Sequence, residues 1–246
     1  MTERPVFPPL LRPFAVTPEV HPFERCLGLA AEGADAGTLL WSIGQDACEG
    51  AIVLAPEQPR EPSLPIVLIA MLGLGDALGV MVPPMVAVTF GWPDRIEVNG
   101  GVVGGVRFAC AATETTAAVP DWLVIGFGIA VRGHQAGQPG ADRLQRTTLA
   151  DEGCGEVMTL DLLEAFGRHF LSWINRWQEE GVEPVQRAWL SRATGLGKRI
   201  EVPLRDQVRS GTFEGLTETG ALRLVRDGVA QTIALDEAMR VPTWSI

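Results

Sequence analysis

Apolar residues recur at helical spacing in two stretches of the chain. Between residues 159 and 180 they fall three and four positions apart, which predicts an amphipathic helix; they are Leu162, Leu163, Phe166, Phe170, Trp173, Ile174 and Trp177. The same spacing of Phe23, Leu27 and Ala30 predicts a helix over 21–34. The uncharged run over 64–75 is too short to cross a bilayer, and it predicts a buried helix over 62–78.

Short apolar stretches bounded by turn residues predict the strands, which lie at 38–43, 51–55, 86–90, 95–98, 102–112 and 121–131. The turn Asn99-Gly100-Gly101 joins two of them in a hairpin. After residue 200, short strands follow one another with glycine turns, as is typical of a small β-barrel. These predicted helices and strands together indicate an α+β protein. We expect it to have three parts: a proline-rich arm (1–20), a main domain (21–199) and a small C-terminal barrel (200–246).

Charge and cysteine spacing narrow the class of protein. The net charge is −10, and Lys198 is the single lysine among 20 basic residues. An acidic chain without a basic stripe is not expected to bind nucleic acid or acidic membranes. Cys26, Cys48, Cys110 and Cys154 form no CxxC pair, so neither a metal site nor a disulfide framework is expected. With no secretory signal in its first residues, the protein is expected to be cytoplasmic.

The hairpin carries a resemblance to a known family. Its segment GWPDRIEVNGGVVGGV (91–106) resembles the KWPNDxxVNGKKxxGI segment of biotin protein ligases. Further segments of that family are resembled in the same order by residues 30–41, 124–131, 146–153, 159–180, 189–202 and 211–225. We identify the chain as similar to the biotin/lipoate–protein ligase superfamily. The resemblance implies a mixed sheet flanked by helices and a C-terminal SH3-like β-barrel.

The same resemblance implies an adenylating site that uses ATP and Mg²⁺, and the chain departs from it. In the family, a QxxGRGRxGR loop covers the acyl-adenylate, and a lysine before Trp-Pro contacts the carboxylate. Here Cys48, Glu49 and Gly50 stand where Gly-Arg-Gly is expected, Gly91 stands in place of the lysine, and Ala130 replaces an asparagine. Loss of one such cation costs a rate factor of about 10² to 10³. Arg95 and Arg107 are the arginines nearest in sequence that could substitute.

Candidate site residues follow from the resemblance. The ligand-binding candidates are Gly37, Gln45, Ala47, Trp92, Pro93, Asp94, Gly104, Gly105, Gly128 and Ala130. Arg95 is a catalytic candidate as a substitute cation. Cys48 is another, because octanoyl- and lipoyl-transferring relatives use a thiol nucleophile, although Glu49 beside it would raise its pKa. The alternatives are structural: Trp92 as a core side chain, and Gly104-Gly105 as room for another backbone.

Three hypotheses for the function remain open at this point. In the first, a degenerate ligase keeps its pocket for a small acid, or recognises a biotinyl or lipoyl carrier protein, without activating a carboxylate. In the second, an active ligase, or a cysteine-dependent acyl or lipoyl transferase, carries out chemistry. In the third, the chain is a protein-interaction or regulatory module. The ligand and the oligomeric state, including a homodimer, are not readable from these residues.

Overall fold

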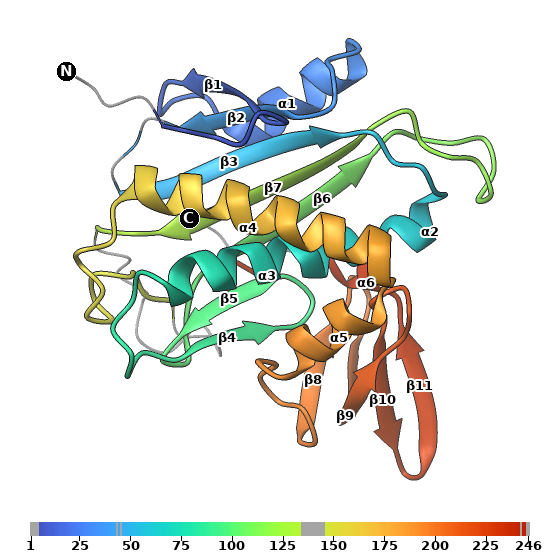
Figure 1. The fold of residues 1–246 in the computed structure, drawn as a ribbon. Helices are drawn as coiled ribbons and strands as arrows, with labels where there is room; N and C mark the ends of the chain where they lie inside the picture. The colour runs from blue at the N-terminus through green and yellow to red at the C-terminus, as the bar shows by residue number, and fades with distance from the viewer. Residues whose placement is uncertain (1–4, 43, 45, 134–145, 242, 245–246) are drawn as a thin grey trace.

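The computed structural model describes residues 5–42, 44, 46–133, 146–241 and 243–244, and arranges them around two β-sheets. Within these residues the larger sheet has seven strands in the order β1-β2-β3-β7-β6-β5-β4. The smaller sheet has four antiparallel strands in the order β11-β10-β9-β8. Figure 1 shows the smaller sheet at one end of the larger one, with α5 and α6 near the junction. The α+β class predicted from the sequence is therefore confirmed.

The larger sheet is antiparallel except at one edge, where β1 and β2 run parallel. Its strands are β1 (Arg12–Val16), β2 (Thr38–Ser42), β3 (Ala47–Leu54), β4 (Val88–Gly91), β5 (Arg95–Val98), β6 (Gly101–Cys110) and β7 (Leu123–Ala130). The predicted hairpin is the β5–β6 pair, and Asn99 has the positive φ that its turn requires.

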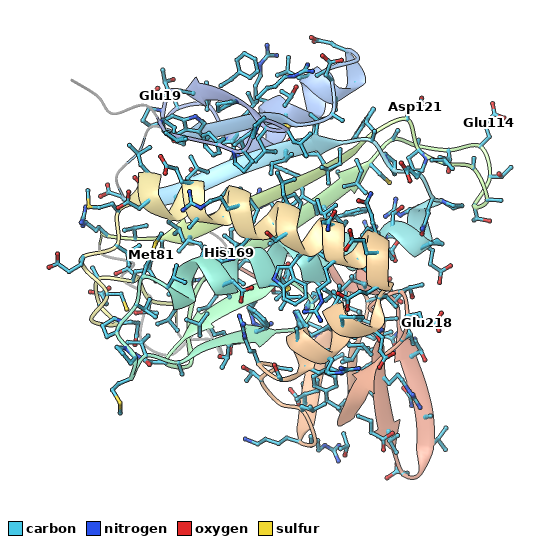
Figure 2. The ribbon with its side chains drawn as sticks, in the orientation of Figure 1. Glu19, Met81, Glu114, Asp121, His169 and Glu218 are labelled. Atoms are coloured by element: carbon cyan, nitrogen blue, oxygen red, sulfur yellow. The ribbon has the colours of Figure 1, made fainter. Side chains whose placement is uncertain are left out.

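Helices cover both faces of this sheet. On one face lie α3 (Pro65–Gly79) and α4 (Thr159–Glu180), which share the main hydrophobic core with the sheet (Figure 1). On the other face α1 (Pro22–Ala31) buries Phe23, Cys26 and Ala30 in a smaller cluster. Figure 2 shows His169 on α4, away from the α1 face. The sheet thus has one thickly covered face and one that α1 covers only in part.

The C-terminal part begins with α5 (Glu183–Leu190) and continues through the four-stranded sheet. Its strands are β8 (Arg199–Pro203), β9 (Val208–Leu216), β10 (Leu222–Arg226) and β11 (Val229–Ile233), followed by α6 (Leu235–Ala238). The indole N–H of Trp92 donates to the Gly220 carbonyl across the junction at 3.0 Å. This sheet is the predicted C-terminal β unit, and its closure into an SH3-like barrel stays a prediction.

Two sequence expectations are wrong in detail. The sequence predicted no strand in the proline-rich arm over 1–20, but Arg12–Val16 is a strand of the main sheet and pairs with β2. The side chains of this strand are mostly exposed, so it has no alternation of buried and exposed residues that would predict a strand. Backbone pairing alone defines it. The strand predicted from residue 51 begins at Ala47, because β7 pairs with it as far as Ala130. β3 therefore begins four residues earlier than predicted.

The apolar helix of the core was also expected, and the structure shows where it lies. The stretch Arg60–Gly79, which includes α2 (Arg60–Ser63), is long and apolar enough to cross a membrane by composition. Of its most apolar window, 83% is buried inside the protein. This burial is that of a core helix, as the sequence predicted.

Candidate functional site

A row of paired residues crosses the main sheet on the face of α1. Gly91 pairs with Arg95, Arg95 with Gly105, Gly105 with Gly128, and Gly128 with Glu49. Directly paired residues of neighbouring strands point to the same face. The row therefore takes one residue from each of five neighbouring strands, in the order β4, β5, β6, β7 and β3. Three of these residues are glycines, one is an arginine and one is a glutamate. It brings together predicted site residues from distant parts of the chain.

Two aromatic rings lie on the glycine strip, which consists of Gly105, Gly126 and Gly128 on this face of the sheet. Phe23 of α1 stands over Gly126, where an added Cβ would meet the ring at 2.9 Å from Cγ. Trp244 stands over Gly105, where an added Cβ would lie 2.5 Å from the indole nitrogen. The indole N–H donates to the Val106 carbonyl at 3.1 Å, and Trp244 is only 6% exposed. The glycines thus leave room that side chains of the same chain occupy.

Little space remains beneath these rings. The cavity there has a volume of about 10 Å³, room for at most one water molecule. Its walls are His21, Pro22, Phe23, Glu49, Gly50, Arg107, Phe127 and Trp244. A ligand larger than water can therefore enter this place only if a side chain moves.

At one end of the row an arginine fills the space beside Gly91. An added Cβ on Gly91 would lie 2.6 Å from an Arg95 guanidinium nitrogen and 2.5 Å from Glu97 Oε1. Arg95 and Glu97 form an ion pair at 3.4 Å, and both side chains are largely buried. The Thr194 hydroxyl donates to the second oxygen of Glu97 at 2.7 Å. The cation nearest to Gly91 is therefore neutralised by its own carboxylate.

Arg107 lies beside the row, where it pairs with Gly126, and Glu49 lies at the far end of the row. The Arg107 guanidinium stacks over the Trp244 ring, 5.1 Å from its centroid. It makes no ion pair with any residue in the described part of the chain. Glu49 faces His21, with 3.9 Å between its carboxylate and the imidazole Nε2. Arg107 is thus the cation of this face with capacity for a further anion.

Asp94 is a buried carboxyl beside the row. Its side chain accepts the hydroxyl hydrogen of Thr243, and its backbone carbonyl accepts the Val106 N–H at 2.9 Å. Burial raises the pKa of Asp94 from its ordinary value of 3.8 to about 6, against the lowering effects of Thr243, Arg95 and Trp244. The folded protein therefore holds this proton more tightly than the unfolded chain does.

The sign of the resulting pH dependence follows from linkage. Because the pKa of Asp94 is higher in the folded protein than in the unfolded chain, the protonated carboxyl stabilises the folded state at low pH. This contribution is lost as pH rises through about 6. We expect Asp94→Asn to remove this titration. Between pH 4.5 and 7.5 the free energy of unfolding should fall by roughly 2 kcal/mol more in the wild type than in Asp94→Asn. Urea denaturation of both proteins at the two pH values measures it, and parallel pH dependence would contradict the assignment.

The remaining predicted site residues divide between the row and other places. Ala47 and Ala130 form the next pair on the face of Glu49 and Gly128. Gly37 is not brought to the row: its N–H donates to the Val53 carbonyl at 2.8 Å, at the other end of β3. Gln45 lies outside the described residues.

Trp92 and Pro93 line a different cavity, of about 230 Å³, between the main sheet and β8. Arg95, Thr194, Glu201 and Thr243 are among its other walls. The Trp92 indole itself points to Gly220 and belongs to the main core, so its position fits the structural alternative. Gly104 and Gly105 also fit that alternative. An added Cβ on Gly104 would lie 2.8 Å from the Gly128 carbonyl carbon, and one on Gly105 would clash with the Asp94 carbonyl oxygen.

Cys48 points away from the row. It precedes Glu49 on β3, so its side chain faces the opposite side of the sheet and lies in the main core. Its thiol is 3.5 Å from the Thr159 carbonyl at the start of α4. Burial raises the pKa of Cys48 far above its ordinary value, and the Glu49 charge raises it further. A thiol in this position is neither ionised nor accessible to a substrate on the α1 face.

Thiol labelling provides a direct check. At pH 8, Ellman's reagent should react with Cys110 first, because it is the least buried of the four cysteines, all of which the structure describes. We expect Cys110→Ser to remove the fast phase and Cys48→Ser to leave it unchanged. Loss of the fast phase in Cys48→Ser would instead show a reactive Cys48.

Sequence reasoning missed the residues that cover the row. Trp244 and Thr243 lie more than 130 positions from Val106, and no local pattern links them. Phe23 was identified as a helix residue, but its ring over Gly126 depends on how α1 packs. Glu97 reads as a strand residue in a hairpin, and only the structure shows that it pairs with Arg95.

The geometry and the sequence together define the class of protein. A family model described as "Biotin/lipoate A/B protein ligase family" matches residues 7–191, and one for the biotin protein ligase C terminal domain matches residues 195–234. The first match spans most of the chain, so the protein belongs to the biotin/lipoate A/B protein ligase family.

Individual relatives agree with this assignment. A biotin–[acetyl-CoA-carboxylase] ligase of Paracoccus denitrificans is 28% identical over 189 residues, covering 75% of this chain and 76% of the relative. A biotin protein ligase-like protein of unknown function from a Silicibacter species is similar in structure, with a TM-score of 0.85 at 33% identity, covering 96% of this chain and 99% of that one. Biotin protein ligase from Aquifex aeolicus has a TM-score of 0.73 at 18% identity, covering 92% and 97%, which shows the shared fold.

Proposed function

We propose that this chain is a non-activating member of its family, which binds a small acyl or carboxylate ligand, or a biotinyl or lipoyl carrier domain, without ATP-dependent activation. One observation carries the proposal. The row Gly91–Arg95–Gly105–Gly128–Glu49 carries three glycines that present no side chain to a ligand, yet its two charged members do not supply a positive field. Arg95 is paired with Glu97, and the far end of the row is a carboxylate.

The charges around the row argue against activation. Adenylation gathers negative charge on a carboxylate and on phosphates, and catalysis needs fixed cations at those places. Among the described residues, two arginines, Arg95 and Arg107, face this region together with three carboxylates, Asp94, Glu97 and Glu49. At neutral pH the carboxylates outnumber the cations, since even a pKa of about 6 leaves Asp94 mostly ionised. A developing phosphate charge would be repelled at the Glu49 end.

ATP and Mg²⁺, which the family resemblance implies, fit these residues poorly. Glu49 stands in the row where the resemblance expects a loop arginine, and Arg95 already has a carboxylate partner. Within the described residues no group of three or more His, Cys, Asp or Glu side chains is arranged to hold a metal ion. The proposal therefore includes no step through a nucleotide or a metal.

Binding of an acid remains well supported. Arg107 lies against the strip and can pair with a carboxylate, and Gly128 presents no side chain that would keep a ligand from the backbone. The match to a biotin protein ligase C terminal domain and the similarity to a biotin–[acetyl-CoA-carboxylase] ligase support a carrier protein as the partner class. We propose a cytoplasmic location, which the four free cysteines support.

Calorimetric titration tests the proposal. Biotin, lipoate and octanoate are titrated separately, without nucleotide, into the wild type and into Arg107→Met, which keeps the side-chain bulk and removes the charge. We expect at least one acid to bind and its affinity to fall about tenfold or more in Arg107→Met. Arg223→Met, on the solvent side of β10, is the matched control and should bind like the wild type. Absence of acid binding, or equal binding by all three proteins, would overturn the proposed binding of a small acid at Arg107.

One observation favours a second candidate, a pure protein-interaction module. The cavity on the α1 face measures only about 10 Å³ because Trp244 and Phe23 occupy the strip. A site filled permanently by its own side chains would have no small ligand. The same titration separates the two, because an interaction module binds none of the three acids.

A further inference from the structure

The segment after α6 returns from the C-terminal part to the main sheet. Ala238 ends α6, which the Arg60–Asp236 ion pair holds at the far side of the junction. Six residues later, Trp244 lies on the glycine row of the main sheet, with its N–H on the Val106 carbonyl. The preceding Thr243 donates its hydroxyl to Asp94. Thr243 and Trp244, which follow the C-terminal part of the chain, thus occupy the candidate site on the main sheet.

Trp244 is buried in an unusual way. It is 6% exposed, yet neither of the two apolar clusters formed by the described residues includes it. Its ring contacts the Arg107 guanidinium, the Val106 carbonyl and the backbone at Gly105. A core tryptophan such as Trp189 instead lies among Phe90, Phe213 and Met71. The contacts of Trp244 are those that a bound ring makes on a polar site.

Each of these contacts can be taken over by a ligand. Arg107 can exchange the indole face for a carboxylate, and the Val106 carbonyl can accept an N–H from elsewhere. The cavity beside the ring is about 10 Å³, so an acid the size of octanoate cannot bind beside Trp244. The indole and such a ligand are therefore mutually exclusive on this strip.

We propose that Thr243 and Trp244 form a self-supplied cover of the glycine row, which a small carboxylate ligand must displace in order to bind. The inference rests on the proposed function, because it concerns the ligand of that same site. A cover that is closed nearly all the time lowers the apparent affinity by the fraction of molecules that are open. At 1% open, the loss is about 100-fold.

Two measurements on the same samples test the cover. The first is calorimetric titration of biotin, lipoate and octanoate into the full-length wild type, Trp244→Ala and Thr243→Val. The second is ¹⁹F NMR of the 5-fluorotryptophan-labelled wild type, in which Trp244→Phe identifies the Trp244 signal. We expect an acid to bind Trp244→Ala at least tenfold more tightly than the wild type, with a smaller gain in Thr243→Val. The same acid should shift the Trp244 signal of the wild type.

The controls separate failure of the cover from failure of the proposed function. Trp177→Ala removes a partly buried tryptophan of α4, on the other face of the sheet, and should leave affinity unchanged. Equal affinities in the wild type, Trp244→Ala and Thr243→Val, with an unmoved Trp244 signal, would overturn the cover and leave acid binding intact. Binding of no acid to any of the proteins would overturn both. If Trp244→Ala does not fold, Thr243→Val and the fluorine signal decide the matter.

Discussion

Gly104→Ala should be the most destabilising single-methyl change on the main sheet. The added Cβ would clash with the Gly128 carbonyl oxygen. It would also lie 2.8 Å from the Gly128 carbonyl carbon and 3.0 Å from Ile129 Cα, both closer than van der Waals contact. These are backbone atoms of β7, a strand paired on both sides, so they cannot move aside as a flexible side chain would. We expect the free energy of unfolding to fall by about 3 kcal/mol or more, or the protein not to fold.

Urea denaturation of Gly104→Ala against Gly155→Ala measures this effect. Gly155 has no atom within 4 Å of an added Cβ, so its variant should stay within about 0.5 kcal/mol of the wild type. A Gly104→Ala protein as stable as Gly155→Ala would show that β6 and β7 do not approach as closely as the structure has them.

Trp189→Ala should cost about 3 to 5 kcal/mol and unfold both sheets together. Trp189 is fully buried on α5, stacked on Phe90 of β4 at 5.9 Å and tilted against Phe213 of β9 at 6.5 Å. Its indole N–H also lies 3.4 Å from the sulfur of Met71 on α3. One ring therefore touches both sheets and the core helix, and its removal leaves a cavity that neither part can close alone.

Thermal unfolding followed by calorimetry tests this shared role. Val229→Ala, on the exposed edge of the smaller sheet, is the control and should change stability by less than about 0.5 kcal/mol. Trp189→Ala should show one transition at a clearly lower temperature. A transition for the larger sheet at the wild-type temperature would contradict a core shared through Trp189.

The elements predicted from the sequence follow from local patterns. The helix predicted over 159–180 has the same first and last residues as α4. The apolar residues that recur at helical spacing in the sequence are the ones on the side of the helix that packs on the core. The hairpin is fixed by Asn99 and Gly100, whose positive φ values the turn requires. β1 has no such local cause, because its side chains are exposed and only backbone pairing with β2 defines it.

The candidate site depends more on contacts between distant residues. The row could be anticipated from the glycines of two strands, but pairing decides that Gly105 faces Gly128 and that Glu49 closes the row. The side of the sheet taken by Cys48 follows from where β3 begins, which the sequence pattern misplaced. Trp244 reaches the site from far along the chain, and no spacing rule could place it there.

The central claim is that the chain binds without activating, and pyrophosphate exchange into ATP tests it most directly. The purified wild type is offered biotin, lipoate and octanoate separately with Mg²⁺, beside an active biotin protein ligase as the positive control. We expect no exchange above the blank without acid. Exchange that depends on one acid and disappears in Arg95→Met would contradict the account, because it would show that Arg95 has replaced the family's lysine.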